Sequence, residues 1–231
     1  TAPMTGEKKP GYLDHRKRLR QRFLDGGADA LPDYELLELL LTMAVPRGDV
    51  KPAAKALLAR FGSFDGVVNA SVDDLRTVKG MGEVAPVAIK VVRAAADRLL
   101  RAEVTGKPVL SSFEAVLDYC KLTMAFGGRE QFRVLFLDRK NRLVTDEVQQ
   151  RGTVDHAPVY PREVARRSIE LDATAVILVH NHPSGDPTPS QADIAMTREI
   201  VTALKAVGVA VHDHIVMARG GHSSLRALGH M

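Results

Sequence analysis

The chain has 231 residues, with 32 Lys and Arg against 28 Asp and Glu and a formal net charge of +4. Its 45% hydrophobic and 26% charged residues are typical of a globular protein and argue against general disorder. No apolar run approaches the roughly 18 residues that span a bilayer, and the first residues lack a secretory pattern, so we expect a cytoplasmic protein without a membrane partner. The single cysteine, Cys120, excludes an internal disulfide and a cysteine-based zinc cluster.

The first part of the chain has helical periodicity and helix punctuation throughout. Leu36–Leu41 predicts a strongly buried helix, and Gly80–Gly82 separates a short helix from a last one that runs from about Glu83 to Leu100. The sequence therefore predicts an all-α domain over residues 12–102.

Glu103–Ser111 has the composition of a linker, and the periodicity changes after it. The elements expected there are a helix over 112–126, strands over 132–137 and 143–149, a helix over 161–171, a strand over 173–180, a helix over 190–207, a strand over 209–217 and a hairpin at 220–221. We therefore expect an α/β (α+β) domain over residues 109–231, with a β-sheet and flanking helices.

A histidine pair follows the most hydrophobic strand. Side chains alternate along a strand, so His180 and His182 point to the same face, and Pro183 places them at the strand's end. Ser190 is suited to cap the next helix, and Asp193 lies in that helix's first turn, from which it can fold back toward both imidazoles.

Two imidazoles and one carboxylate form a three-ligand set that suits one zinc ion per chain, with water in the fourth position. The alternative is structural: Ser-x-x-Asp is also an ordinary capping box, in which Asp193 only complements the helix dipole. Convergence of all three groups on one strand-to-helix turn favours the metal site.

These residues carry a resemblance to known proteins. The His-x-His pair, Ser190 and Asp193 match the JAMM (MPN+) metalloprotease signature in every position and spacing. Residues 180–190, with 160–163 before them and 213–216 after them, resemble the bacterial RadC family, and the similarity extends over nearly the whole chain.

The resemblance implies a JAMM/MPN-like domain with a cytidine-deaminase-like sheet, in which the two histidines and the aspartate bind zinc. It also implies that Ser190 donates a hydrogen bond to the tetrahedral intermediate and that an upstream glutamate acts as general base. Glu130 fits that position because it follows a helix and directly precedes a strand, while Glu147 on the next strand is the rival. Either glutamate could instead be an ordinary surface carboxylate.

A second pair two residues apart, His212 and His214, has no acidic capping turn nearby, so we interpret it as structural.

The glycine-rich turn of the helical domain resembles a helix-hairpin-helix. Gly80 and Gly82 permit a tight turn whose N–H groups can meet a phosphate, with Lys79 beside them. A basic run that includes Arg16 and Arg18 could add charge for non-specific contact with the DNA backbone. A plain helix connector, a solvated helix face or a protein-interaction module are the competing interpretations, and the acidic residue after Gly82 departs from the family's hairpin pattern.

Two functions follow as hypotheses. One is a zinc-dependent hydrolase of peptide or isopeptide bonds, with a protein substrate. The other is a DNA repair or recombination accessory protein that binds DNA through its N-terminal domain, with a metal site that is structural or acts on nucleic acid. A metal-free scaffold is disfavoured because the full ligand set is present.

Overall fold

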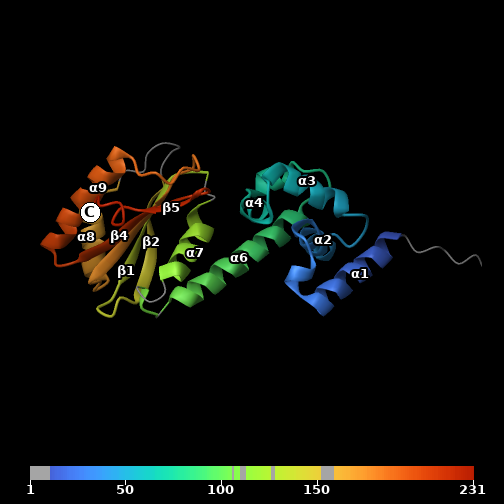
Figure 1. The fold of residues 1–231 in the computed structure, drawn as a ribbon, viewed down its shortest axis with the longest axis horizontal. Helices are drawn as coiled ribbons and strands as arrows, with labels where there is room; N and C mark the ends of the chain where they lie inside the picture. The colour runs from blue at the N-terminus through green and yellow to red at the C-terminus, as the bar shows by residue number, and fades with distance from the viewer. Residues whose placement is uncertain (1–10, 106, 110–112, 126–127, 152–158) are drawn as a thin grey trace, which may run out of the picture. The chain divides into compact units, whose positions relative to one another are not determined.

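A computed structural model describes residues 11–105, 107–109, 113–125, 128–151 and 159–231 (Figure 1). The chain divides into two compact units between Ala95 and Ala96. The first unit is helical, and the second combines a five-stranded sheet with helices. Within the described ranges, no helix is both long and apolar enough to cross a membrane.

Most helices of the first unit pack around one apolar core, as the leucine pattern predicts, and Leu19, Leu31 and Leu39 form a second, smaller cluster. The helices of this unit are α1 (Gly11–Gly26), the 3-10 turn η1 (Ala28–Ala30), α2 (Asp33–Ala44), α3 (Lys51–Phe61), α4 (Phe64–Asn69), α5 (Val72–Arg76) and the first part of α6 (Val84–Val104). Leu37 of α2, Leu57 of α3 and Ile89 of α6 are fully buried against one another. Ser71 caps α5 by accepting a hydrogen bond from the N–H of Asp74.

Two helices of this part differ from the sequence prediction. The helix α4 was not predicted, since Gly66 lowers the helical propensity of its short sequence, and its N-terminus depends on a hydrogen bond from the Gly66 N–H to the Ser63 hydroxyl. The helix predicted to end near Leu100 continues to Val104, into the expected linker, because Val104 is fully buried in the core of the second unit.

The second unit contains every strand and helix that the sequence predicts there. They are α7 (Phe113–Met124), β1 (Gln131–Leu137), β2 (Leu143–Arg151), α8 (Pro161–Glu170), β3 (Ala175–Asn181), α9 (Gln191–Ala206), β4 (Ala210–Ala218) and β5 (Gly221–Ser224). The sheet order is β2-β1-β3-β4-β5, in which β3 and β4 are parallel and the other neighbours antiparallel. Residues 112 and 126, the expected ends of α7, lie outside the described residues.

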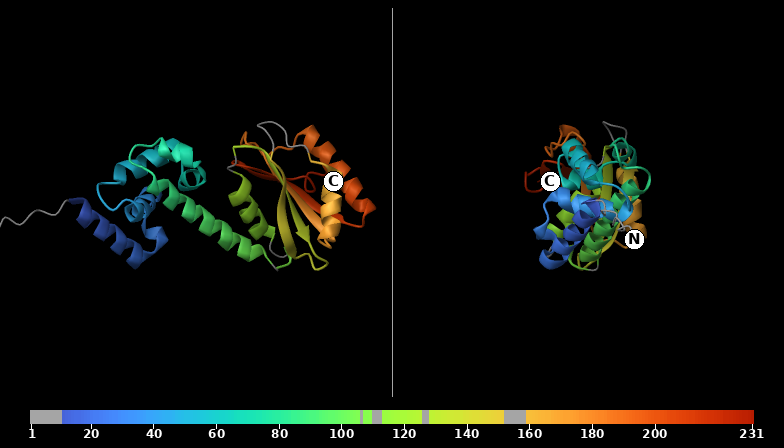
Figure 2. Two further views of the ribbon diagram at one scale, coloured as in Figure 1. Left: turned by 180° about the vertical axis from the view of Figure 1, so that it is seen from behind. Right: turned by 90° about the vertical axis from the view of Figure 1, so that its right-hand side faces the viewer.

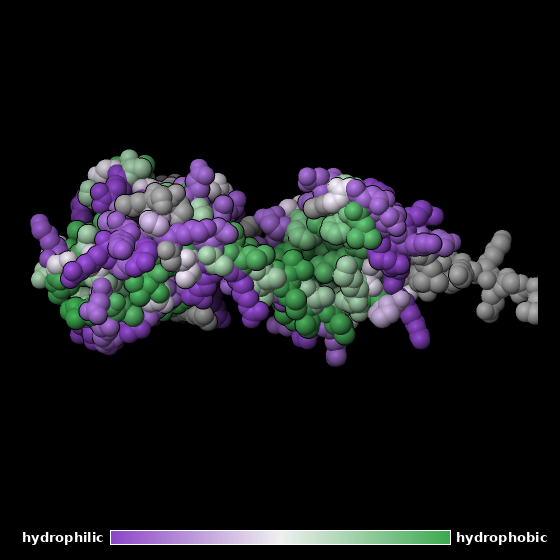
Figure 3. Space-filling view, turned by 90° about the horizontal axis from the view of Figure 1, so that it is seen from below, coloured by the Kyte–Doolittle hydropathy of each residue, from purple (hydrophilic) through white to green (hydrophobic). Residues whose placement is uncertain are grey.

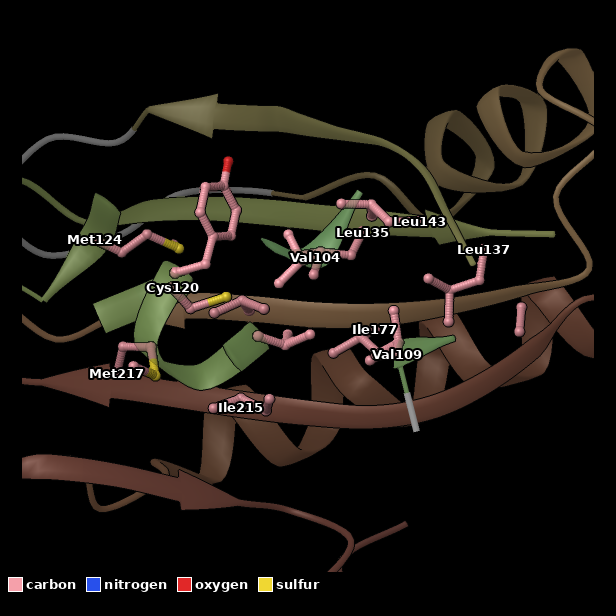
Figure 4. Packing of buried hydrophobic residues seen from close by; sticks show 14 residues of the cluster. Val104, Val109, Cys120, Met124, Leu135, Leu137, Leu143, Ile177, Ile215 and Met217 are labelled. Carbon is pink, nitrogen blue, oxygen red and sulfur yellow. The ribbon is translucent and has the colours of Figure 1, made fainter. Parts of the chain in front are cut away.

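The sheet is covered on both faces, which explains why all seven residues of β3 are buried. Leu135 and Ile177 pack with α7 and the end of α6 on one face, in the core drawn in Figure 4. Val134 and Leu178 pack with α8 and α9 on the other face, and Figure 2 shows these helices opposite α7. His180 continues the alternation of Leu178, so its side chain lies on the α9 face.

Cys120 belongs to the core on the α7 face, as expected from the sequence. Complete burial raises the pKa of its thiol to about 12, so the side chain remains a neutral thiol at physiological pH.

Apolar side chains also reach the surface of the first unit, where Figure 3 shows hydrophobic residues gathered over much of one face. The exposed large apolar residues of this unit include Met43 of α2 and Val84, Val87 and Val91 of α6. The three valines are three and four positions apart, so they lie on one face of α6.

Candidate metal centre

The histidine pair lies at the carboxyl end of the central strand β3. His180 is paired with Phe132 of β1 on one side and with Val216 of β4 on the other. His182 follows directly after the strand, with its N–H bonded to the Met217 carbonyl at 2.8 Å. The prediction that the pair stands where the strand ends is confirmed.

A capping box at the start of α9 orients the third side chain. The N–H of Asp193 donates to Ser190 Oγ at 3.1 Å, and Asp193 Oδ2 accepts the N–H of Ser190 at 2.7 Å. Asp193 Oδ1 is 3.2 Å from His180 Nε2, and Oδ2 is 3.3 Å from His182 Nε2. The two Nε2 atoms are 2.9 Å apart. The capping box and the convergence of ligands are therefore one arrangement, because the cap turns the carboxylate toward both rings.

This donor set fits a tetrahedral metal ion. Ligand atoms about 2.0–2.1 Å from zinc would be roughly 3.3 Å from one another, close to the separations observed. His182 Nδ1 contacts the carbonyl oxygen of Asp186 at 3.0 Å and must donate to it, so in the neutral ring Nε2 carries a lone pair toward Asp193 and His180. Lone pairs and a carboxylate that face one another at these distances repel unless a cation or a proton lies between them.

Asp193 and His182 shift one another's pKa values, each favouring the charged form of the other. Burial by itself would raise the pKa of Asp193, but hydrogen bonds from the rings of His180 and His182 in their protonated form outweigh it and hold that pKa far below its usual range. The hydrogen bond with Asp193 raises the pKa of His182 above 6.5; burial opposes this rise, while the Asp186 carbonyl and the charge of Glu130 add to it. The site thus favours positive charge beside an ionised carboxylate.

Comparison with known proteins agrees with this geometry. Residues 110–230 match the RadC-like JAB domain family, and residues 12–87 match the UPF0758 N-terminal family. The chain belongs to the RadC family. It is 57% identical to a UPF0758 protein of Ruegeria pomeroyi over 96% of this chain and 100% of that one. It is 61% identical to a UPF0758 protein of Rhodobacter capsulatus over 91% of this chain and 99% of that one.

The RadC-like JAB domain belongs to the JAMM hydrolase superfamily, whose members are typically metal-dependent. His180, His182 and Asp193 form a group of side chains in the described chain that could hold a metal ion. The resemblance drawn from the sequence is therefore confirmed at the level of the family, and the identity of the metal stays a prediction.

Glu130 lies at the same edge of the sheet as the histidines. Because β1 and β3 are antiparallel and pair Phe132 with His180, the residues just before β1 stand beside those just after β3. Glu130 is half-buried there, and its charge contributes to the raised pKa of His182. The structure thus brings Glu130 into the electrostatic environment of the site.

Glu147, its rival, has a different environment. It lies on β2, and both its carboxylate oxygens accept hydrogen bonds from Arg167 of α8, at 2.6 to 3.0 Å. This two-point ion pair connects the edge strand β2 to the helix α8, which is a structural role for Glu147.

Ser190 contacts Asp193 as an acceptor, which leaves the hydroxyl hydrogen of this exposed side chain for a donor role. Its part in stabilising an oxyanion stays a prediction.

The residues predicted to contact DNA divide into two groups. Lys79 and Arg18 are exposed, and Gly80 and Gly82 have φ of 94° and 53°, in the left-handed region that favours glycine. Arg16 is 6% exposed, and its guanidinium donates to three main-chain carbonyls, those of Val45, Pro46 and Gly48. Arg16 therefore holds the loop after α2 instead of contributing to the basic surface.

A β-bulge separates the second histidine pair. Val176 pairs with Val211 and Ile177 with Asp213, so His212 is the extra residue and turns to Asn141, 2.6 Å from its Oδ1. His214 is fully buried, and burial lowers its pKa well below 6.5. These contacts agree with a structural role for both histidines. Because of the bulge, however, their side chains do not lie on the same face of β4, as a spacing of two residues would suggest.

Two side chains close to the site were missed by sequence reasoning. Asn181 hydrogen-bonds the main chain on either side of Glu130, and His214 contacts the ring of His180. Asn181 points away from its neighbouring histidines on β3, and nothing in the sequence indicated its partners.

Proposed function

We propose that this chain is a zinc-dependent hydrolase of the JAMM type that acts on peptide or isopeptide bonds. The convergence of His180, His182 and Asp193 at 2.9 to 3.3 Å carries the proposal. A zinc ion held by these three residues would lower the pKa of a coordinated water from 15.7 to about 7 and would thereby supply a hydroxide nucleophile at neutral pH.

The residues around the metal site supply the remaining chemistry. Glu130 accepts a proton from the attacking water and later donates it to the leaving amine nitrogen, so that water is added across the C–N bond. Ser190 donates its hydroxyl hydrogen to the carbonyl oxygen as negative charge develops there. The pairing of Phe132 with His180 places Glu130 beside the end of β3, and this position supports Glu130 over Glu147 as the general base.

The proposal is tested by metal analysis followed by substrate assays. Purified protein is expected to contain about one zinc ion per chain, and the zinc-loaded protein to cleave linear or isopeptide-linked peptides. Single-stranded, duplex and branched DNA serve as competing substrates in the same assay. Zinc-loaded protein that cleaves DNA and leaves every amide bond intact would overturn the proposal.

DNA contact by the first unit is a second proposal, supported by the left-handed Gly80 and Gly82 beside the exposed Lys79. N–H groups of such a turn at the start of α6 can meet a phosphate. Binding through phosphates must weaken steeply as salt is added. Lys79→Ala should reduce the affinity for duplexes of unrelated sequence alike, and binding that does not respond to salt would contradict this role.

A further inference from the structure

A buried row of hydrogen-bonding groups lies behind His180 on the α9 face of the sheet. His180 Nδ1 is 2.8 Å from His214 Nε2, and His214 Nδ1 is 2.5 Å from the hydroxyl oxygen of Thr197. That hydroxyl lies 2.6 Å from the main-chain carbonyl oxygen of Asp193. The row therefore begins on the main chain of one candidate metal ligand and ends on the ring of another.

The protons in this row have one consistent arrangement. A carbonyl oxygen only accepts, so Thr197 must donate its single hydroxyl hydrogen to Asp193. Thr197 then has only lone pairs to offer His214, whose Nδ1 must carry a hydrogen and donate it. A neutral imidazole has one N–H, so His214 Nε2 is an acceptor, and His180 must donate to it from Nδ1. His180 Nε2 is thereby left with a lone pair directed at Asp193 and His182.

We propose that Thr197 and His214 are positioning residues that fix the Nδ1–H tautomer of His180 and so prepare its Nε2 to bind zinc. This inference rests on the proposed metal centre, because it concerns how one of its ligands is prepared. The opposite tautomer would place a hydrogen on Nε2, between His180 and His182, and would block the ligand atom.

The surrounding fold holds each member of the row in place. His180, Thr197 and His214 are each at most 1% exposed, so water does not compete for their hydrogen bonds. Phe132 stacks on the His180 ring at 6.3 Å between centroids and meets His214 edge-on at 5.5 Å. The bulge at His212 sets the register that turns His214 toward α9.

Thr197 allows a test that leaves every metal ligand intact. Thr197→Val removes the hydroxyl and keeps the side-chain shape, and Thr197→Ser keeps the hydroxyl as a matched control. Zinc affinity is measured with zinc alone by competition with a chelator. The tautomer of His180 is read in the zinc-free full chain from long-range proton–nitrogen NMR correlations of labelled histidines.

We expect His180 as the Nδ1–H tautomer in the wild type and in Thr197→Ser, with equal zinc affinities. Thr197→Val should populate the Nε2–H tautomer and bind zinc about 10- to 100-fold more weakly. An Nε2–H tautomer in the wild type, or unchanged tautomer and affinity in Thr197→Val, overturns the inference.

A second comparison covers the case in which Thr197→Val does not fold. His214→Gln retains an acceptor oxygen for His180, whereas His214→Leu does not. The inference requires that His214→Gln bind zinc more tightly than His214→Leu, and equal affinities contradict it. A wild-type chain that shows the Nδ1–H tautomer but binds no zinc would refute the proposed function, while the tautomer assignment would stand.

Discussion

Asn181 accepts a hydrogen bond from the main-chain N–H of Gln131 at 2.8 Å, at the edge of the sheet where β3 ends and β1 begins. The same amide donates from Nδ2 to the carbonyl oxygen of Arg129 at 3.1 Å. Asn181 thus bonds the main chain immediately before and immediately after Glu130, and it is 1% exposed. The residue between the two histidines thereby sets the position of the proposed general base.

Asn181→Ala should separate metal binding from catalysis. The variant keeps both histidines but loses the two bonds that hold the segment around Glu130, and a displacement of about 1 Å can lower a rate by about 100-fold. We expect kcat for peptide hydrolysis to fall by about 10- to 100-fold, with zinc content unchanged. The unfolding free energy should fall by about 1–3 kcal/mol because buried main-chain groups lose their partners.

Val179→Ala is the matched control, since Val179 is fully buried on the same strand and the same face as Asn181. Loss of two buried methyl groups costs on the order of 2 kcal/mol, a similar loss of stability. If this control loses as much activity as Asn181→Ala, general destabilisation explains both results and the positioning role is wrong.

Much of the site could be predicted because it is encoded locally. Strand alternation predicts that His180 and His182 lie on one face, and Pro183 predicts the end of β3. The capping box at Ser190 predicts that Asp193 turns toward the two rings. These relationships depend on short-range geometry within one strand, one loop and one helix turn, which residue type and spacing determine.

The remaining features depend on contacts between distant segments. The position of Glu130 beside the histidines depends on the register of β1 against β3, and the position of His214 depends on the bulge at His212. Likewise, the basic run suggested Arg16 as a surface cation, but the carbonyls that bury its guanidinium lie about 30 residues further along the chain. No pattern within a single element contains this information.

The two candidate glutamates give a direct comparison. Glu130→Gln should lower kcat by about 100- to 10,000-fold, the usual contribution of a general base, and should keep its zinc. Glu147→Gln loses only the partly exposed ion pair with Arg167, so its activity should match the wild type and its stability should change by at most about 1 kcal/mol. The reverse pattern of rates would assign the base to Glu147.

Removal of the metal should destabilise the second unit. A ligand that binds only the folded state adds about 4 kcal/mol when its concentration is 1,000 times Kd, so zinc should raise the melting temperature and a chelator should lower it again. His182→Ala should lose both the zinc and the response to chelator, whereas His222→Ala, at an exposed position, should keep them. Calorimetry with and without zinc measures this, and a His182→Ala variant that still gains stability from zinc would place the metal elsewhere.

The cluster that Asp146 forms with Arg101, Arg133 and Tyr119 should contribute to the stability of the fold and not to the chemistry of the metal site. The buried Asp146 carboxylate pairs with Arg101 and Arg133 and accepts a hydrogen bond from Tyr119 at 2.7 Å. Removing one partner of a buried pair leaves uncompensated charge, so Asp146→Ala should lower the unfolding free energy by about 3–5 kcal/mol. Denaturant titration checks the size of the loss, and a change below about 1 kcal/mol would show that the cluster behaves as a surface pair.

The raised pKa of His182 gives the zinc-free protein a characteristic pH dependence. A histidine whose pKa is higher in the folded than in the unfolded chain stabilises the fold fully below the unfolded value of 6.5, and this contribution is lost as pH rises through the folded value. Zinc must displace the same proton, so zinc affinity should change in the opposite sense and increase with pH over that interval. Denaturant titrations of metal-free protein between about pH 5 and 9 measure the first effect, and chelator competition measures the second. His182→Gln cannot be protonated there, so its stability profile should lack this component; parallel profiles for the variant and the wild type would show that another group titrates.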